Sequence, residues 1–267
     1  MTSEVGVTSW AIWNAGGVSI NEAPVSGTGA GLGFWSERPP STPGARGRSL
    51  PASASALVQL AQQVLAARRV GFLPELPSVI GVRLGTMNGS RENDLAFLQS
   101  LAERGESLGS PSLFVHTLST APLADVTLAL GCRGAISTVS NGEASGLLAV
   151  ALGAGALAAG RSAACLCGAM DVCGSESDVI ALFLLEQARS DIAVPRLSGW
   201  ELTFEATRPP SAGSLRSSME RLVLALSSHE GGPVSASSAT GESVRLSVVP
   251  AGRSAGFGER VADLERG

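Results

Sequence analysis

The feature that most constrains the fold is a short polar turn between two strongly apolar segments. The turn lies within Thr138–Gly146 (Thr-Val-Ser-Asn-Gly-Glu-Ala-Ser-Gly), after an expected strand and before a long apolar helix. This order forms an elbow, in which the first backbone N–H groups of the helix point at one site and can stabilise a developing oxyanion. Such an elbow usually carries a nucleophile at its tip, where this chain has Glu143. Because a carboxylate is a poor acyl nucleophile, the sequence predicts an acyl-transfer site that lacks its reactive atom.

Strands and helices alternate around this elbow, which predicts an α/β layered fold. The Gly and Ala residues of the helix after the elbow indicate close packing between layers, because small side chains let backbones approach. We expect strands or extended segments at Val5–Trp13, Val79–Leu84, Leu113–Leu118, Ala135–Val139, Ala163–Met170, Val179–Leu185, Pro195–Ala206 and Ser243–Val249. We expect helices at Ala52–Val70, Arg91–Arg104, Leu123–Leu130, Ala144–Ala159 and Ser214–Ser227.

The composition limits the classes of function that the chain can have. Hydrophobic residues make up 44% and charged residues 16%, which is apolar for a free monomer and favours a permanent partner. A net charge of −4 argues against nucleic acid as a partner. All 19 basic residues are Arg, so lysine chemistry is excluded. His116 and His229 lie far apart in sequence and leave little imidazole for catalysis or metal binding, and we expect no cofactor.

The cysteines and the apolar segments bear on the cellular location. The N-terminal sequence lacks the basic start and apolar core of a signal peptide. The longest apolar run, Leu147–Ala159, is shorter than the roughly 20 residues that span a bilayer. We therefore expect a cytoplasmic protein without a membrane span. The cysteines lack the spacing of a zinc site and are interpreted as buried, inert thiols: Cys132, Cys165, Cys167 and Cys173.

Six segments lie in order within the roughly 60 residues from Pro111 to Met170. They are Pro111-Ser-Leu-Phe-Val115, Thr120-Ala-Pro-Leu-Ala124, Gly131-Cys-Arg-Gly134, Ser137-Thr-Val-Ser-Asn-Gly-Glu-Ala-Ser-Gly146, Leu157-Ala-Ala-Gly-Arg161 and Cys165-Leu-Cys-Gly-Ala-Met170. In this order they resemble the ketosynthase family of the thiolase fold. The resemblance implies a thiolase-like layered fold, and it places Glu143 at the position of the family's nucleophilic cysteine.

The chain departs from the family in its C-terminal half. Family enzymes carry two catalytic histidines and a lysine there, whereas this chain has no lysine, and His229 lacks the glycine-threonine context of those histidines. Only Asp171–Asp178 fills the place of a long family insertion. We expect one ketosynthase-like domain over 1–267, with a thiolase-like N-terminal half over 1–190, a reduced C-terminal part over 191–250 and a loose tail over 251–267.

This shortened pattern without the catalytic cysteine resembles the short chain-length factors of type II polyketide systems, notably those that make aryl polyenes. The resemblance implies a non-catalytic subunit that pairs with an active β-ketoacyl synthase as a heterodimer and shapes its acyl tunnel. An acyl carrier protein would then be a partner through the complex. Two alternatives stay open: a decarboxylating or atypical condensing enzyme that uses Glu143, and a homodimeric acyl-binding pseudoenzyme.

The resemblance also implies roles for two residues near the dimer interface. Leu113 and Phe114 occupy the place from which related ketosynthases reach across the dimer into the partner's acyl pocket, so we predict that they gate chain length. The alternative is that Phe114 is an ordinary core residue. The strand Ala135–Val139 is expected near the twofold axis of the dimer.

Three further residues have candidate roles. Glu143 is interpreted as an inert remnant held by the elbow N–H groups and the helix dipole. An interface contact with an arginine, or an acid/base role, is the alternative for Glu143. His116 is interpreted as a structural or interface histidine. Arg133 is interpreted as a structural residue, because a guanidinium in a tight turn can bind several carbonyl groups.

Overall fold

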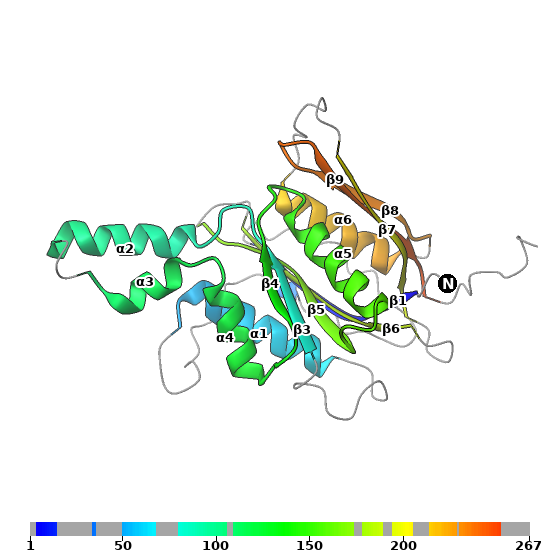
Figure 1. Ribbon diagram of the computed structural model, residues 1–267, viewed down its shortest axis with the longest axis horizontal. Helices are drawn as coiled ribbons and strands as arrows, with labels where there is room; N and C mark the ends of the chain where they lie inside the picture. The colour runs from blue at the N-terminus through cyan, green and yellow to red at the C-terminus, as the bar shows by residue number, and fades with distance from the viewer. Residues whose placement is uncertain are drawn as a thin grey trace, which may run out of the picture.

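The computed structural model describes residues 4–14, 34–35, 50–67, 80–105, 109–173, 178–188, 194–204, 214–228 and 230–251 (Figure 1). The strands are β1 (Val5–Asn14), β2 (Phe34–Trp35), β3 (Ile80–Gly85), β4 (Ile136–Val139), β5 (Ala164–Asp171), β6 (Val179–Gln187), β7 (Arg196–Phe204), β8 (Gly232–Ser237) and β9 (Glu242–Val249). The helices are α1 (Ala52–Ala66), α2 (Arg91–Arg104), α3 (Pro111–Thr117), α4 (Ala121–Leu130), α5 (Ser145–Ala158) and α6 (Leu215–Ser227).

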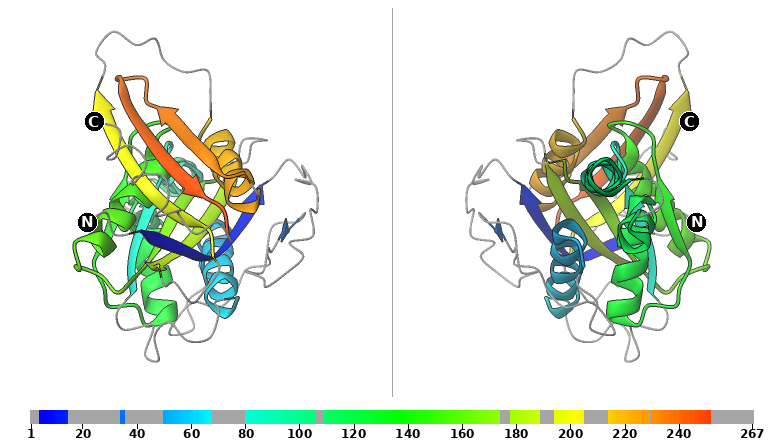
Figure 2. Two further views of the ribbon diagram at one scale, coloured as in Figure 1. Left: turned by 90° about the vertical axis from the view of Figure 1, so that its right-hand side faces the viewer. Right: turned by 90° about the vertical axis from the view of Figure 1, so that its left-hand side faces the viewer.

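The described strands join in one mixed sheet. Their order is β4-β3-β5-β6-β1-β7-β9-β8, and β2 pairs with β1. Strand β3 runs parallel to both β4 and β5, whereas β6 runs antiparallel to both β5 and β1. The sheet bends back over itself, so the β7-β9-β8 part lies above the rest with helices between them (Figures 1 and 2).

Helices cover both faces of the N-terminal part of the sheet, which confirms the predicted α/β layers. On one face, α1 and α4 bury apolar side chains such as Leu57 and Leu123 against β3, β5 and β6. On the other face, α5 and α6 form a middle layer, in which Leu147 and Met219 pack against β5 and β6 below and β9 above. All eight residues of β5 are buried, as expected for a strand covered on both faces.

Helix α5 lies unusually close to the sheet. A Cβ atom at Gly153 would lie 2.2 Å from the Cys167 sulfur and 3.3 Å from the Cys165 sulfur. The predicted close packing is therefore confirmed, and it depends on the absence of a side chain at this position. Cys132, Cys165 and Cys167 are buried free thiols, while Cys173 is partly exposed. Burial raises the pKa of the Cys167 thiol, which favours its protonated form.

The C-terminal part contains one strand that the sequence analysis did not predict. Strand β8 has a Gly-Pro start and a Ser-rich composition, which carry little local strand preference. It forms because it pairs with β9 and buries Val234 and Ala236 beneath that part of the sheet. The other face carries a row of exposed polar residues. Arg245 of β9 lies opposite Glu201 of β7 and opposite Ser235 of β8 in the strand register.

One sequence prediction was wrong. The segment Leu113–Leu118 was expected to be extended, but most of it belongs to helix α3. The Ser110 hydroxyl accepts a hydrogen bond from the Leu113 N–H group, and Pro111 occupies the first helical turn. An N-cap and an N-terminal proline favour a helix, and here they outweigh the extended preference of the aromatic and β-branched residues. His229 and residues 252–267 lie outside the described part of the chain.

Within the described ranges, no single helix combines the length and the apolar composition needed to cross a membrane. Helices α3 and α4 meet these two criteria only as a pair, and the pair is bent by 99°.

The close approach of α5 gives a direct test of the layer packing. We expect Gly153→Ala to lower the free energy of unfolding by about 1–3 kcal/mol, because the new methyl group overlaps the Cys167 sulfur. Gly155→Ala is the matched control: its Cβ would lie 3.7 Å from Trp200 Nε1, and the gain in helix propensity is worth up to about 1 kcal/mol.

Urea unfolding of both variants measures these changes. The double variant Gly153→Ala, Cys167→Ala should lose less free energy of unfolding than the two single variants lose together, because it removes the sulfur that the new methyl group overlaps. Equal stability of the Gly153→Ala and Gly155→Ala variants would contradict the close approach.

Candidate functional site

The elbow is held in shape by hydrogen bonds of its own. Strand β4 ends at Val139, and α5 begins six residues later at Ser145. The buried Ser145 hydroxyl accepts a hydrogen bond from the Asn141 N–H group (2.7 Å) and donates one to the Gly142 carbonyl (2.6 Å). Gly142 has a φ of +54°, a left-handed conformation that glycine adopts readily. The sharp turn predicted from the sequence is therefore present.

Two neighbouring elements fix the start of α5. Gly85, at the end of β3, approaches so closely that a Cβ there would lie 2.3 Å from the Ser145 carbonyl carbon. On the other side, a Cβ at Gly146 would lie 2.7 Å from the terminal methyl of Met219 in α6. The first turn of α5 is thus wedged between β3 and α6, which determines the direction in which the elbow points.

Glu143 is partly exposed at the tip of the elbow. Its backbone carbonyl accepts a hydrogen bond from the Ser218 hydroxyl of α6 (3.3 Å). The β8–β9 turn also lies close, because a Cβ at Gly142 would be 3.8 Å from Ser238 Cβ. These contacts come from hydroxyl and backbone groups, so they fix the turn but supply neither a thiol nor an imidazole.

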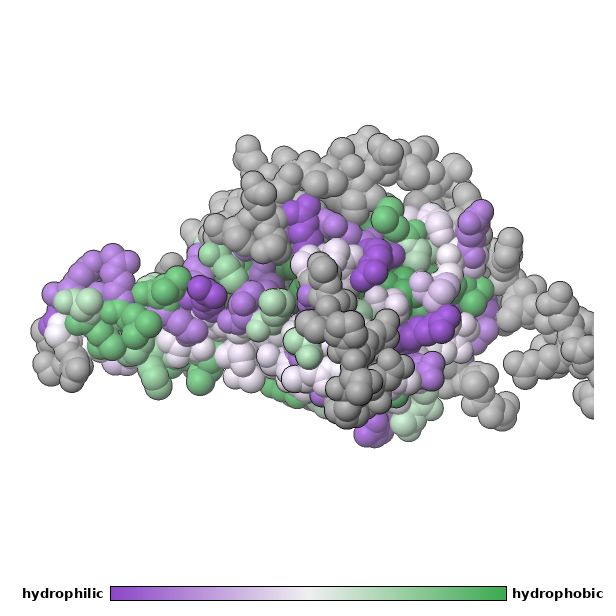
Figure 3. Space-filling view, turned by 90° about the horizontal axis from the view of Figure 1, so that it is seen from above, coloured by the Kyte–Doolittle hydropathy of each residue, from purple (hydrophilic) through white to green (hydrophobic). Residues whose placement is uncertain are grey.

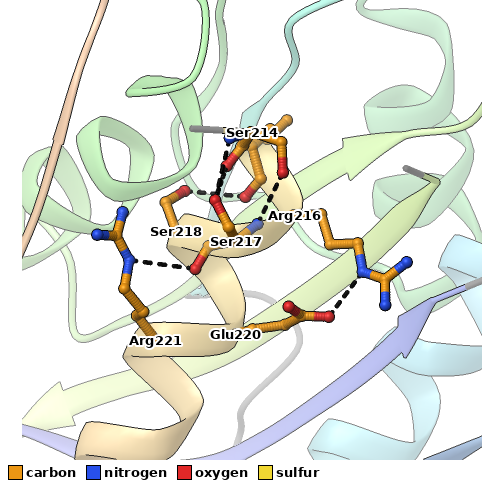
Figure 4. A network of polar contacts seen from close by, with 7 residues as sticks. Ser214, Arg216, Ser217, Ser218, Glu220 and Arg221 are labelled. Carbon is orange, nitrogen blue, oxygen red and sulfur yellow. Dashed lines mark hydrogen bonds and ion pairs between the residues drawn. The ribbon is translucent and has the colours of Figure 1, made fainter. Parts of the chain in front are cut away.

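The start of α6, which contacts the elbow, is rich in serine (Figure 4). Ser214 and Ser217 form a reciprocal capping box at its N-terminus. An ion pair between Arg216 and Glu220 (2.7 Å) follows on the first turns of the helix. These contacts stabilise the end of α6 that touches the elbow.

A second polar cluster lies where β3 and β5 end, next to the elbow strand. The buried Asp171 carboxylate accepts hydrogen bonds from the Thr86 hydroxyl (3.1 Å), the Asn88 N–H group (2.9 Å) and the Asn88 side-chain amide (2.6 Å). The cluster fixes the loop that leads into α2. Sequence reasoning missed it, although an acidic residue after a fully apolar strand is a usable signal.

Helices α2 and α3 project from the body of the protein as an arm (Figure 1). Only Asn93 and Ser100 are buried in α2, and no residue is buried in α3. Large apolar side chains are instead exposed on the arm, where Figure 3 shows hydrophobic residues gathered. They are Leu95, Leu98, Phe114, Val115 and Leu118.

The neighbouring elements continue this exposed apolar character. Leu128 on α4 is 66% exposed, and Ile136 on β4 is 51% exposed. Strand β4 is also the outermost strand of the sheet in the described part of the chain, so one of its backbone edges is unpaired. We call the exposed apolar residues of α2, α3, α4 and β4 the apolar surface.

The structure separates the predicted site residues into two groups. Glu143 lies at the elbow, whereas Leu113, Phe114 and His116 lie on α3 in the arm. Phe114 is 55% exposed and stacks at a tilt on Phe97 of α2, with ring centroids 5.5 Å apart, so it is not a core residue of this chain. His116 Nδ1 lies 3.7 Å from an Asp125 carboxylate oxygen of α4.

Two further findings concern binding groups. Arg133 is exposed in the turn that precedes β4. Among the described residues, no group of three or more His, Cys, Asp or Glu side chains is arranged to hold a metal ion.

Comparison with known families gives this geometry its context. A family model described as "Beta-ketoacyl synthase, N-terminal domain" matches residues 48–186, which is more than half of the 267 residues. The chain belongs to this family. The match includes β3, β4, α5 and β5, so the elbow of this ketosynthase-like chain lies within the matched region.

Solved structures share the ketosynthase-like fold at low sequence identity. A ketosynthase in complex with its chain length factor from Xenorhabdus doucetiae (ApeO–ApeC) matches with a TM-score of 0.57 and 18% identity. A type II polyketide synthase ketosynthase in complex with its acyl-carrier protein (AntDE:AntF) gives 0.56 and 14%, and a β-ketoacyl synthase from Burkholderia phymatum STM815 gives 0.55 and 16%. These matches confirm the predicted thiolase-like layered fold. A search of the curated proteins finds no match.

The matched structures differ in how much of their length this ketosynthase-like chain spans. The AntDE:AntF match covers 80% of this chain and 66% of that chain, just under two thirds, and the B. phymatum match covers 83% and 69%. The ApeO–ApeC match covers 91% of this chain and 98% of that chain. The matched chain of that complex is therefore about as short as this one.

Proposed function

We propose that this chain is a non-catalytic chain-length-factor subunit, which pairs with an active β-ketoacyl synthase and shapes its acyl tunnel in type II polyketide biosynthesis of the aryl-polyene kind. The observation that carries the proposal is an intact ketosynthase elbow with a carboxylate, Glu143, at its tip. The exposed apolar arm supports the second half of the proposal, because it needs a partner surface.

The first step concerns catalysis. Acyl transfer in this fold needs a nucleophile that forms a covalent intermediate, and an ionised carboxylate is weak in that role. The whole sequence contains no lysine. The elbow is nevertheless held by Ser145, Ser218 and two close glycine contacts. This pattern favours a retained scaffold over an active site, and it favours a role for Glu143 as a remnant.

The second step concerns assembly. An arm with five large apolar side chains exposed is costly in water, and exposed apolar patches of this kind mark protein interfaces. The unpaired edge of β4 offers backbone groups for pairing with a strand of another subunit. We propose that β4 lies near the twofold axis of a ketosynthase heterodimer and that the apolar surface is covered by the partner.

The comparisons favour this partner. The ApeO–ApeC structure is described as a ketosynthase with its chain length factor, and it contains a chain of nearly the same length as this one. The AntDE:AntF structure is described as an acyl-carrier protein with its ketosynthase. We extend both associations to this chain: a catalytic ketosynthase as the direct partner and an acyl carrier protein as the partner of the complex.

The third step concerns the acyl tunnel. Phe114 sits on a short helix whose residues are all at least partly exposed, and the face of its ring that does not stack on Phe97 is available to a partner's pocket. The adjacent Leu113 is partly exposed on the same helix. We propose that these two side chains close the far end of the partner's acyl tunnel and so limit product length.

Assembly is tested by a charge on the edge strand. We expect Ile136→Asp to weaken binding to the ketosynthase at least tenfold, because the carboxylate would be buried without a partner in the interface. Ser235→Asp, on the exposed outer face of β8, is the control and should bind normally. The measurement is copurification and size-exclusion chromatography of the coexpressed pair. A stable homodimer of this chain alone that binds acyl chains would instead favour the pseudoenzyme alternative.

Product length is tested in the arm. We expect Phe114→Ala and Leu113→Ala to lengthen the polyketide products of the assembled complex, because each removes side-chain volume from the end of the tunnel. Leu224→Ala, a similarly exposed apolar residue on α6, is the control and should leave products unchanged. Mass spectrometry of the products reads out the chain length, and an unaltered product spectrum in both arm variants would disprove the gating role.

Catalysis is tested at the elbow. We expect Glu143→Gln and Glu143→Ala complexes to retain condensation activity within about twofold of the parent, since a remnant makes no bond in the transition state. Product formation per assembled complex is the measurement. A large loss of activity with assembly intact would overturn the non-catalytic assignment and favour the decarboxylating or condensing alternative.

A further inference from the structure

A titratable pair lies at the joint between α3 and α4. His116 Nδ1 of α3 and a carboxylate oxygen of Asp125 of α4 are 3.7 Å apart, and the two side chains are 18% and 16% exposed. Both of these atoms are inaccessible to solvent, and neither has a hydrogen-bond partner among the described residues. Because these two atoms make no hydrogen bond, the contact is favourable mainly when the imidazole and the carboxylate carry opposite charges.

Several elements with charged groups pack around the pair. His116 is the titratable residue of α3, and Asp125 is the charged residue of α4. Helix α2, which also packs against α3, carries Arg91, Glu92, Asp94, Glu103 and Arg104. Helix α4 packs against α1, which has no charged residue, and against β3, which carries Arg83. Burial raises the pKa of the Asp125 carboxyl, and His116 is the neighbouring charge that lowers it.

Helix α3 packs mainly on α2 and more lightly on α4. The helix has no buried residue, and Phe114 stacks on Phe97 of α2. The Ser90 hydroxyl donates a hydrogen bond to the Leu118 carbonyl just after the helix (3.0 Å). The contact between His116 and Asp125 joins α3 to α4, the helix against which α3 packs less.

We propose that His116 and Asp125 form a proton-dependent contact that fixes α3, and with it Phe114, against α4. His116 is then a positioning residue for the arm. The consequence for product length rests on the proposed function, whereas the contact itself does not.

The direction of the pH dependence follows from the two groups. A buried carboxyl with a raised pKa destabilises its surroundings once it ionises, so at alkaline pH Asp125 is a buried anion that faces a neutral imidazole. An imidazolium at His116 compensates that anion, whereas a neutral imidazole does not. Below the raised pKa of Asp125 the anion is lost and the attraction ends. The contact is strongest where the imidazolium and the carboxylate coexist.

Hydrogen exchange of the full chain, alone or in its complex, tests this contact. The measured quantity is the protection of amides 112–118, corrected for intrinsic exchange and divided by the protection of amides 145–158 of α5. This ratio should rise about threefold from pH 8 to pH 6, as for a partly screened ion pair. His116→Gln and Asp125→Asn should each abolish this rise. Glu103→Gln, which changes a carboxylate of α2 that pairs with Gln99, is the control and should retain it. A pH-independent parent, or a rise that persists in both variants, would overturn the inference.

Product analysis separates this inference from the proposed function. If Phe114→Ala leaves the products unchanged while the exchange effect is present, the gating role fails and the contact stands. If Phe114→Ala lengthens the products while exchange is independent of pH, the contact fails and the gating role stands.

Discussion

The close packing of α5 between the two parts of the sheet is the constraint on which the rest of the structure depends. Gly85, Gly146 and Gly153 each bring a backbone so near its neighbour that a Cβ atom would lie within 2.7 Å of another atom. Three glycines therefore determine the spacing of the layers. They also set the direction of the elbow, because Gly146 lies in the first turn of α5 and Gly85 packs against that turn.

The elbow shows which contacts give the turn its shape. The hydrogen bonds that shape the turn are made by Ser145, Ser218 and backbone groups, and none of them depends on the identity of the tip residue. These particular hydrogen bonds are thus compatible with either a cysteine or a glutamate at the tip. Conversely, the presence of the geometry says nothing about catalysis, which depends on the atom at the tip.

The distribution of apolar residues divides the molecule into a self-sufficient body and an incomplete arm. The body buries most of its apolar side chains in two clusters on either side of the sheet, with Leu152, Leu202 and Leu224 exposed. The outer face of its β7-β9-β8 part is polar at Glu201, Ser235 and Arg245. The arm and the β4 edge show the opposite pattern, with Phe114 and Ile136 exposed. Apolar composition alone pointed to a partner, and the fold shows on which elements the unburied residues lie.

The sequence by itself determined the elements whose signal is local. The alternation of strands and helices, the elbow, and helix α5 follow from apolar periodicity and from turn residues, because these patterns depend on the backbone geometry of a few neighbours. Glu143 at the tip could be read directly for the same reason.

Only the tertiary structure decided the features that depend on distant residues. Strand β8 forms because β9 offers it an edge. The contacts of Asp171 with Asn88, and of His116 with Asp125, join segments whose separation in the sequence hides them. The position of β4 at the edge of the sheet likewise follows from strand order, which no local pattern encodes.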